Sequence, residues 1–293
     1  MGDDAAATAG DAIARVLVFL DAELREQLAA VRRDDPDAVH QARIRVRRIR
    51  SVLAVYRRFF ARGQSEDLRR DLRALGAALG TARDPEVRAK TTEDLLLAHT
   101  APAVIDAIES LAGQSRDEHG QAREDLLHLF DSVEHAALLD RLTMFAVDPP
   151  LHRHRAERPA RRSFRKALRR EVRRVDERAR AAADLQLEEL HELRKKVRRL
   201  RYAADAVSSE PVAVLGIRTQ RLANAAETAQ DVLGSHRDEI LLARHLRHAL
   251  AGHRLGRSAA TGVGIFAARS EKQANRQLDR LDVALDGIRE LYA

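Results

Sequence analysis

Two stretches of the chain place histidine and arginine on one face of a predicted helix. At helical spacing, the basic side chains of each stretch fall within an arc of about 100°. The first set is His40, Arg43, Arg47, Arg50 and Arg57. The second set is His191, Arg194, Arg198 and Arg201, with Lys195 beside them. Arginine forms bidentate hydrogen bonds to phosphate oxygens and histidine can donate one, so this pattern favours binding of a polyanion.

An apolar seam accompanies each basic face. Its residues recur every three or four positions, which is the spacing of a helix that packs against a core. The seams are Ala42, Val46, Ile49, Leu53, Tyr56 and Phe60 in the first stretch, and Leu193, Val197, Leu200 and Ala204 in the second. Each seam fixes the rotation of its helix, so the basic face must point in a defined direction.

The first basic face carries no compensating charge of its own. No acidic residue lies between Val39 and Phe60, although a solvated helix face normally mixes signs at these spacings. A face that serves only solubility remains an alternative, as does a structural role for His40 and His191. Repulsion that recurs in both stretches favours a polyanion that relieves it.

A third basic stretch precedes the second set. Eleven arginines and lysines lie between Arg153 and Arg174, against two acidic residues, Glu157 and Glu171. We include four of its basic residues among the candidate anion ligands: Arg162, Lys166, Arg169 and Arg173. The corresponding residues of the first half, 11–30, are nearly neutral, so the two halves differ in charge.

The two basic helices belong to an internal repeat. The segment 39–50 aligns without a gap on 190–201, and Leu-Gly-Thr-Ala-Arg-Asp at 79–84 returns as Leu-Gly-Ser-His-Arg-Asp at 233–238. Two motifs in the same order predict two homologous halves, 1–148 and 158–293, each a helical bundle, joined by a linker at 149–157. In each half, we expect the glycine of the second motif to end one helix and the aspartate to cap the next.

Composition predicts an all-α protein. Alanine, leucine, arginine and glutamate dominate, and no run of alternating β-branched residues is present. We expect a loop at 253–264 because it is rich in glycine. The expected helices are 11–33, 37–60, 65–80, 85–99, 102–116, 119–131, 134–146, 160–183, 187–208, 214–233, 238–252 and 265–291.

Several functional classes are excluded or disfavoured. The chain has no cysteine, which excludes disulfides and thiolate chemistry. No apolar run is long enough to span a membrane, and the acidic N-terminus does not resemble a signal peptide. No nucleophile with a base, no set of metal ligands and no cofactor motif is evident. We therefore expect a cytoplasmic protein with no catalytic residues, no bound metal and no cofactor.

The duplicated His-x-x-Arg-x-x-x-Arg-x-x-Arg helix, followed in each half by Leu-Gly-x-x-Arg-Asp, resembles the CHAD domain family over about residues 10–293. The resemblance implies two helical bundles related by pseudo-two-fold symmetry around a basic central cavity. It also implies binding of inorganic polyphosphate and association with polyphosphate granules. Many relatives carry an N-terminal triphosphatase domain marked by Glu-x-Glu-x-Lys, and this chain lacks that motif.

The leading hypothesis is non-catalytic polyphosphate binding, with a polyphosphate-metabolising enzyme or a granule as a further partner. The alternative is a nucleic-acid-binding protein that ignores base sequence. A sequence pI near 10.3 favours it, but only 3% of residues are aromatic and no reader motif is present. An enzyme that acts on phosphoanhydrides is a third class, and a scaffold that recruits an enzyme to granules is a fourth.

Overall fold

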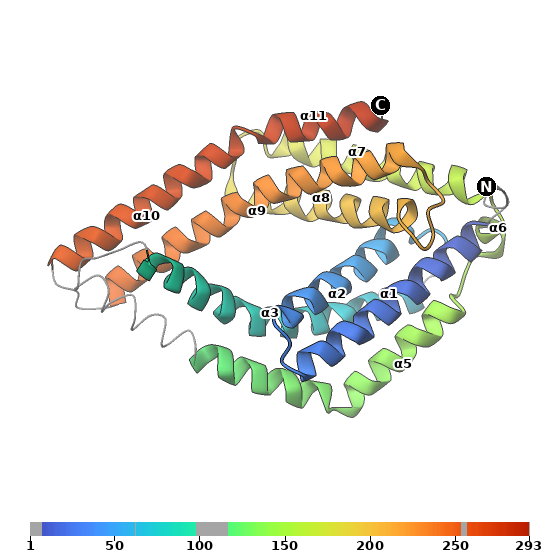
Figure 1. The fold of residues 1–293 in the computed structure, drawn as a ribbon. Coiled ribbons are helices and arrows are strands. Elements are labelled where there is room, and N and C mark those ends of the chain that lie inside the picture. Colours follow the sequence, from blue (N-terminus) through green and yellow to red (C-terminus); the bar gives the residue numbers. More distant parts are fainter. Residues whose placement is uncertain (1–7, 62, 98–116, 253–256, 293) are drawn as a thin grey trace. The chain divides into compact units, whose positions relative to one another are not determined.

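The computed structural model describes residues 8–61, 63–97, 117–252 and 257–292. Within these ranges every regular element is helical, which confirms the predicted all-α fold (Figure 1). Residues 117–130 form one helix. The others are α1 (Ala9–Arg32), α2 (Ala38–Val55), α3 (Gln64–Leu97), α5 (Val133–Val147), α6 (Arg153–Ala156), α7 (Ala160–Ala181), α8 (Leu187–Ser208), α9 (Ile217–Gly252), α10 (Arg257–Leu278) and α11 (Leu281–Tyr292).

The chain forms two compact units. The first combines Met1–Leu79, His128–Gln230 and Val283–Ala293, and the second combines Gly80–Leu127 and Asp231–Asp282. Each unit therefore contains residues from both predicted halves, and the unit boundaries do not follow the predicted linker at 149–157. The internal repeat, its pseudo-two-fold symmetry and the basic central cavity remain predictions.

The most extensive helix contacts in the first compact unit are those of α1 with α2, α7 with α8, and α2 with α8. Both predicted apolar seams are buried in it, as expected. The first turn of α1 is capped by Thr8, whose hydroxyl accepts a hydrogen bond from the Asp11 amide at 3.1 Å. The second unit has its own apolar cluster, in which Leu246 packs with Val263 and Ala267.

The helix predicted at 37–60 is shorter than expected, because α2 ends at Val55. The residues after it bond to the predicted linker instead of continuing the helix. The amide of His152 donates to the Phe59 carbonyl at 2.7 Å, and the amide of Ala61 donates to the Pro150 carbonyl at 2.6 Å. Tyr56 and Phe60 are buried by this turn.

The capping role predicted for the Leu-Gly-x-x-Arg-Asp motifs is wrong. Both copies lie inside uninterrupted helices, 79–84 in α3 and 233–238 in α9. A glycine inside a helix costs about 1 kcal/mol, and burial of neighbouring residues on the same helices offsets this cost. Those buried neighbours are Leu79, Ala82, Leu233 and His236.

Two further boundaries differ from expectation. α10 begins at Arg257 and contains two of the three glycines of the expected loop at 253–264, because Val263 and Ala267 pack on Leu246. The helix expected at 265–291 is divided between α10 and α11. The helix expected at 102–116 lies outside the described residues. Among the described residues, none of the helices combines the length and the apolar content that crossing a bilayer demands.

Candidate functional site

The two predicted basic faces meet where α2 packs against α8. The residues that meet are half-buried and define what we call the α2/α8 arginine cluster: Arg43, Arg47, Arg194 and Arg198. Burial, with the charges of Arg198, Arg43 and Arg194, lowers the pKa of Arg47 to about 9. Separate faces on two helices thus become one concentration of positive charge within the first compact unit.

The pKa of Arg198 is lowered by the same two causes as that of Arg47, burial and neighbouring arginines. Burial, followed by the charge of Arg194 and smaller effects of Arg43 and Arg50, lowers the pKa of Arg198 to about 10. Both values lie above neutral pH, so both guanidinium groups stay charged there. Within the described residues, neither Arg47 nor Arg198 has an acidic partner. The cluster therefore holds desolvated positive charge that an external anion can neutralise.

Contacts outside the cluster fix its two helices. Arg48 of α2 bonds to Glu23 of α1 at 3.0 Å and to Asp205 of α8 at 2.6 Å. The buried Tyr56 hydroxyl donates to the Ala203 carbonyl at 2.8 Å. These bonds hold α2 and α8 in one register, so the arginines of the cluster are positioned before any ligand arrives.

A buried carboxylate fixes α8 against α7. Glu171 of α7 is fully buried and is bonded by Arg174 at 2.8 Å and by Arg199 of α8. Sequence reasoning counted Glu171 only as one of two acids in a basic stretch. Its position shows that it neutralises two arginines that point away from the cluster.

Arg50 extends the basic surface toward α3. Burial, followed by the charges of Arg73 and Arg69 on α3, lowers the pKa of Arg50. α3 approaches α2 closely at Gly76, where an added Cβ would lie 3.2 Å from Val46 Cγ1 and 3.8 Å from Arg50 Nη1. Sequence analysis missed Arg69 and Arg73, although their spacing of four residues places like charges on one helical face.

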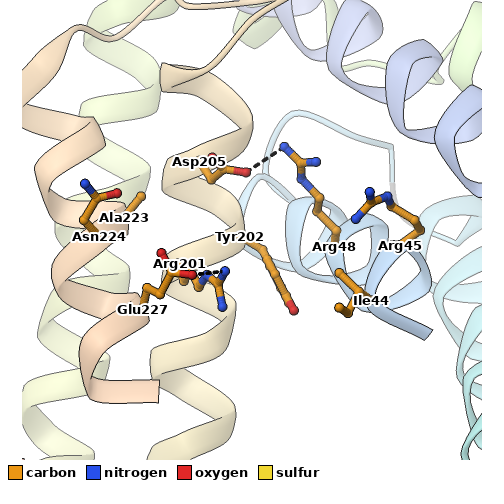
Figure 2. Close-up of a pocket in the computed structure, with 9 residues that line it drawn as sticks. All are labelled: Ile44, Arg45, Arg48, Arg201, Tyr202, Asp205, Ala223, Asn224 and Glu227. Carbon is orange, nitrogen blue, oxygen red and sulfur yellow. Dashed lines mark hydrogen bonds and ion pairs between the residues drawn. The ribbon is translucent and has the colours of Figure 1, made fainter. Parts of the chain in front are cut away.

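Two predicted ligands, Arg201 and Lys195, are paired with acids, and Arg201 also lines a small pocket. Arg201 bonds to Glu227 of α9 at 2.5 Å, beside the Arg48–Asp205 pair (Figure 2). The pocket has a volume of about 140 Å³ and is also lined by Tyr202, over whose ring the Arg201 guanidinium lies at 5.5 Å from the centroid. Lys195 bonds to Glu192 at 2.5 Å. Arg201 and Lys195 thus have internal counter-ions.

The remaining predicted ligands lie elsewhere in the first compact unit. His40 is half-buried in the first turn of α2, and His191 is half-buried in the second turn of α8. Arg57 lies beyond the end of α2, and its charge acts on Arg170 of α7 together with those of Arg58, Arg174 and Arg155. The four candidates on α7 are all exposed: Arg162, Lys166, Arg169 and Arg173. The charges that act on Arg47 and Arg198 come from α2 and α8.

The arrangement suits binding of a multiply charged anion. Guanidinium groups donate paired hydrogen bonds to phosphate oxygens, and their partial burial strengthens each bond. Within the described residues, no group of three or more histidines and carboxylates is placed to hold a metal ion.

Comparisons with known proteins agree with this architecture. The family model of the CHAD domain matches residues 20–247. The uncharacterized proteins MT2285 and Rv2226 of two Mycobacterium tuberculosis strains, CDC 1551 / Oshkosh and ATCC 25618 / H37Rv, are each 31% identical over 263 residues. Each match covers 87% of this chain and 49% of the relative, so the chain spans about half the length of these relatives.

Two solved structures share the fold. PptA from Streptomyces chartreusis superposes with a TM-score of 0.74 at 19% identity, covering 98% of this chain and 99% of PptA. The crystal structure of the CHAD domain from the plant Ricinus communis also gives a TM-score of 0.74, at 22% identity, covering 98% and 94% of the two chains. At these identities the likeness concerns the fold alone.

Proposed function

The chain belongs to the CHAD domain family, and from that premise we propose that it binds inorganic polyphosphate at the α2/α8 arginine cluster without turning it over. The family is associated with polyphosphate-related proteins. The observation that carries the proposal is the pair Arg47 and Arg198, two half-buried like charges on facing helices.

The energetics favour a polyanion over a single small anion. Arg47 and Arg198 lose hydration on burial and are repelled by neighbouring arginines. A ligand with a negative charge on every phosphate group can offset this repulsion at several arginines at once. Release of the ligand's condensed counter-ions adds to the affinity.

The chemistry of the cluster also favours a ligand without bases. Arginine forks match successive phosphates, and polyphosphate offers nothing else to recognise. The aromatic side chains that stack on bases in single-stranded nucleic-acid sites are scarce in this chain. The proposal assigns only binding, and no catalysis, to the cluster. A further partner would be a polyphosphate-metabolising enzyme or a polyphosphate granule.

One observation favours the second candidate, binding of nucleic acid. The exposed face of α7 carries Arg162, Lys166, Arg169 and Arg173 along one helix, and a basic helix of this kind can bind a DNA backbone without reading bases. The two candidates depend on different surfaces, so one experiment separates them.

The test is a titration of the full chain with long-chain polyphosphate, at two salt concentrations near the physiological value, with duplex and single-stranded DNA as competitors. We expect binding that persists at the higher salt and that DNA does not displace. Equal, steeply salt-dependent binding of all three ligands would overturn the proposal and favour a generic basic surface.

Charge reversal then locates the site. Arg47→Glu with Arg198→Glu should abolish polyphosphate binding while circular dichroism shows unchanged helix content. The matched control is Arg221→Glu with Arg244→Glu, because both residues are exposed on α9 and the change in net charge is the same. If the reversed cluster fails to fold, Arg47→Gln with Arg198→Gln replaces it. Normal binding by a folded cluster variant would show that the assignment is wrong.

A further inference from the structure

A second concentration of arginine lines a pocket of about 310 Å³ beside α7. Arg161, Arg165 and Arg169 of α7 line one wall at intervals of one helical turn, and Arg218 at the start of α9 lines another. α11 closes the pocket with Tyr292, and an ion pair between Arg289 and Asp176 fixes α11 beside α7 (Figure 1). All of these residues belong to the first compact unit.

The residues that line the pocket include four arginines and no acidic residue, so the lining itself does not neutralise their charge. Arg161, Arg165 and Arg169 have no ion pair within the described residues. Two acids of α7 and α11 are engaged by other arginines, since Asp176 bonds to Arg180 and Arg289 and Asp286 also bonds to Arg289. Like charges one turn apart repel each other, so an anion is the partner that this pocket lacks.

Arg218 is positioned for such a ligand. Its Nε donates to the Leu291 carbonyl at 2.6 Å, which ties the guanidinium to α11 and orients its terminal nitrogens. Beside it, the hydroxyls of Thr219 and Tyr292 lie 3.0 Å apart, and either can donate to an oxyanion. The first turn of α9, which also lines the pocket, favours negative charge.

Apolar groups complete the lining. Ile217 is 64% exposed and lines the pocket together with Leu291 and the ring of Tyr292. A ligand that fills this volume thus meets four guanidinium groups and a small uncharged wall. The wall suits an organic group attached to the anion.

We propose that this pocket is a second oxyanion site, separate from the α2/α8 arginine cluster, that binds a di- or triphosphate group. The group can be inorganic or carried by a nucleoside, and the apolar wall favours the nucleoside. The proposal does not depend on polyphosphate binding at the cluster, because the two sites share no residue.

The experiment titrates the full chain with inorganic triphosphate and, separately, with a nucleoside triphosphate, by isothermal calorimetry. Arg165→Glu should weaken binding at the pocket by about tenfold or more, which corresponds to loss of a charge-assisted hydrogen bond. The matched control is Arg244→Glu, because Arg244 is exposed in the second compact unit and does not line the pocket. We expect Arg244→Glu to change the affinity less than twofold.

Fluorescence of a tryptophan placed in the pocket gives a second measurement of binding. The chain has no tryptophan, so Tyr292→Trp introduces a single tryptophan whose emission should change on addition of either triphosphate. If the nucleoside triphosphate binds more tightly than inorganic triphosphate, the apolar wall contacts the nucleoside. If the two affinities are equal, the site recognises the phosphates alone.

Two results would overturn the inference. One is equal affinity of Arg165→Glu and Arg244→Glu for both ligands. The other is a single class of triphosphate site that disappears in Arg47→Glu with Arg198→Glu. Conversely, binding that is lost in Arg165→Glu but survives reversal of the cluster would support this pocket even if the proposed function fails.

Discussion

Burial and then the positive charge of Arg198 on α8 are the largest causes of the lowered pKa of Arg47 on α2. The two residues occupy equivalent positions in the two repeated motifs, so the repeat brings like charges together. Repulsion between these charges destabilises the folded state without ligand but strengthens its attraction for an anion. The first three predictions follow from these two opposite effects.

Neutralising Arg47 should stabilise the protein without ligand and weaken polyphosphate binding. Arg47→Gln removes a desolvated charge from a like-charged cluster, and we expect a gain of about 1 kcal/mol in the free energy of unfolding. Urea denaturation measures this gain. The control Arg221→Gln, at an exposed position, should change the unfolding free energy by less than about 0.5 kcal/mol. A destabilised Arg47→Gln would contradict our view of the cluster.

Polyphosphate affinity should fall as the pH rises through about 9 to 10. Without ligand, Arg47 keeps its proton up to a pH of about 9. A bound polyanion favours the charged form and raises this pKa, so binding above pH 9 requires uptake of a proton and becomes weaker. Titrations at constant ionic strength between pH 7 and about 10.5 measure the effect. Affinity that is constant to pH 10 would argue against Arg47 as a ligand.

Salt should weaken polyphosphate binding, and the slope of this salt dependence should reflect the number of arginines that contact phosphate. Each contact with a phosphate releases close to one counter-ion, so the logarithm of affinity falls linearly with the logarithm of salt concentration. Arg198→Gln should reduce the magnitude of that slope by about one. Arg244→Gln, exposed in the second compact unit, serves as the control and should leave the slope unchanged. An unchanged slope in Arg198→Gln would remove this residue from the site.

The buried carboxylate on α7 should be essential for stability. Glu171→Gln leaves Arg174 and Arg199 without their shared counter-ion, and breaking a buried ion pair of this kind costs about 3 kcal/mol. The shift of the urea midpoint checks this value. Glu177→Gln, exposed on the same helix, should leave the midpoint unchanged, and equal effects of the two substitutions would rule out a special role for Glu171.

The sequence predicted the helices and their apolar seams because apolar residues spaced every three or four positions mark the buried face of a helix. Ala42, Val46 and Ile49, and likewise Val197 and Leu200, are almost completely inaccessible to solvent. The same patterns failed at the Leu-Gly-x-x-Arg-Asp motifs, since glycine is a frequent but not an obligatory helix terminator. Packing along α3 and α9, which is not visible locally, carries both helices through the motif.

The candidate site was predicted in part. The basic faces of α2 and α8 were visible in the sequence, but their juxtaposition depends on helix packing. The acids that pair with Arg48 and Arg201 come from α1, α8 and α9. Glu23 and Glu227 are far from these arginines in the sequence, so inspection of one helix could not reveal them. For the same reason, a helix wheel could not show that Arg50 faces Arg69 and Arg73.

The buried positive charge of Arg47 and Arg198 has a consequence for the lifetime of the protein in a cell. A ligand that binds only the folded chain lowers the population of unfolded molecules, and unfolded molecules are those that proteases degrade. Under the proposed function, molecules loaded with polyphosphate would outlast empty ones. The abundance of this protein would then follow the supply of its ligand, with no change in its synthesis.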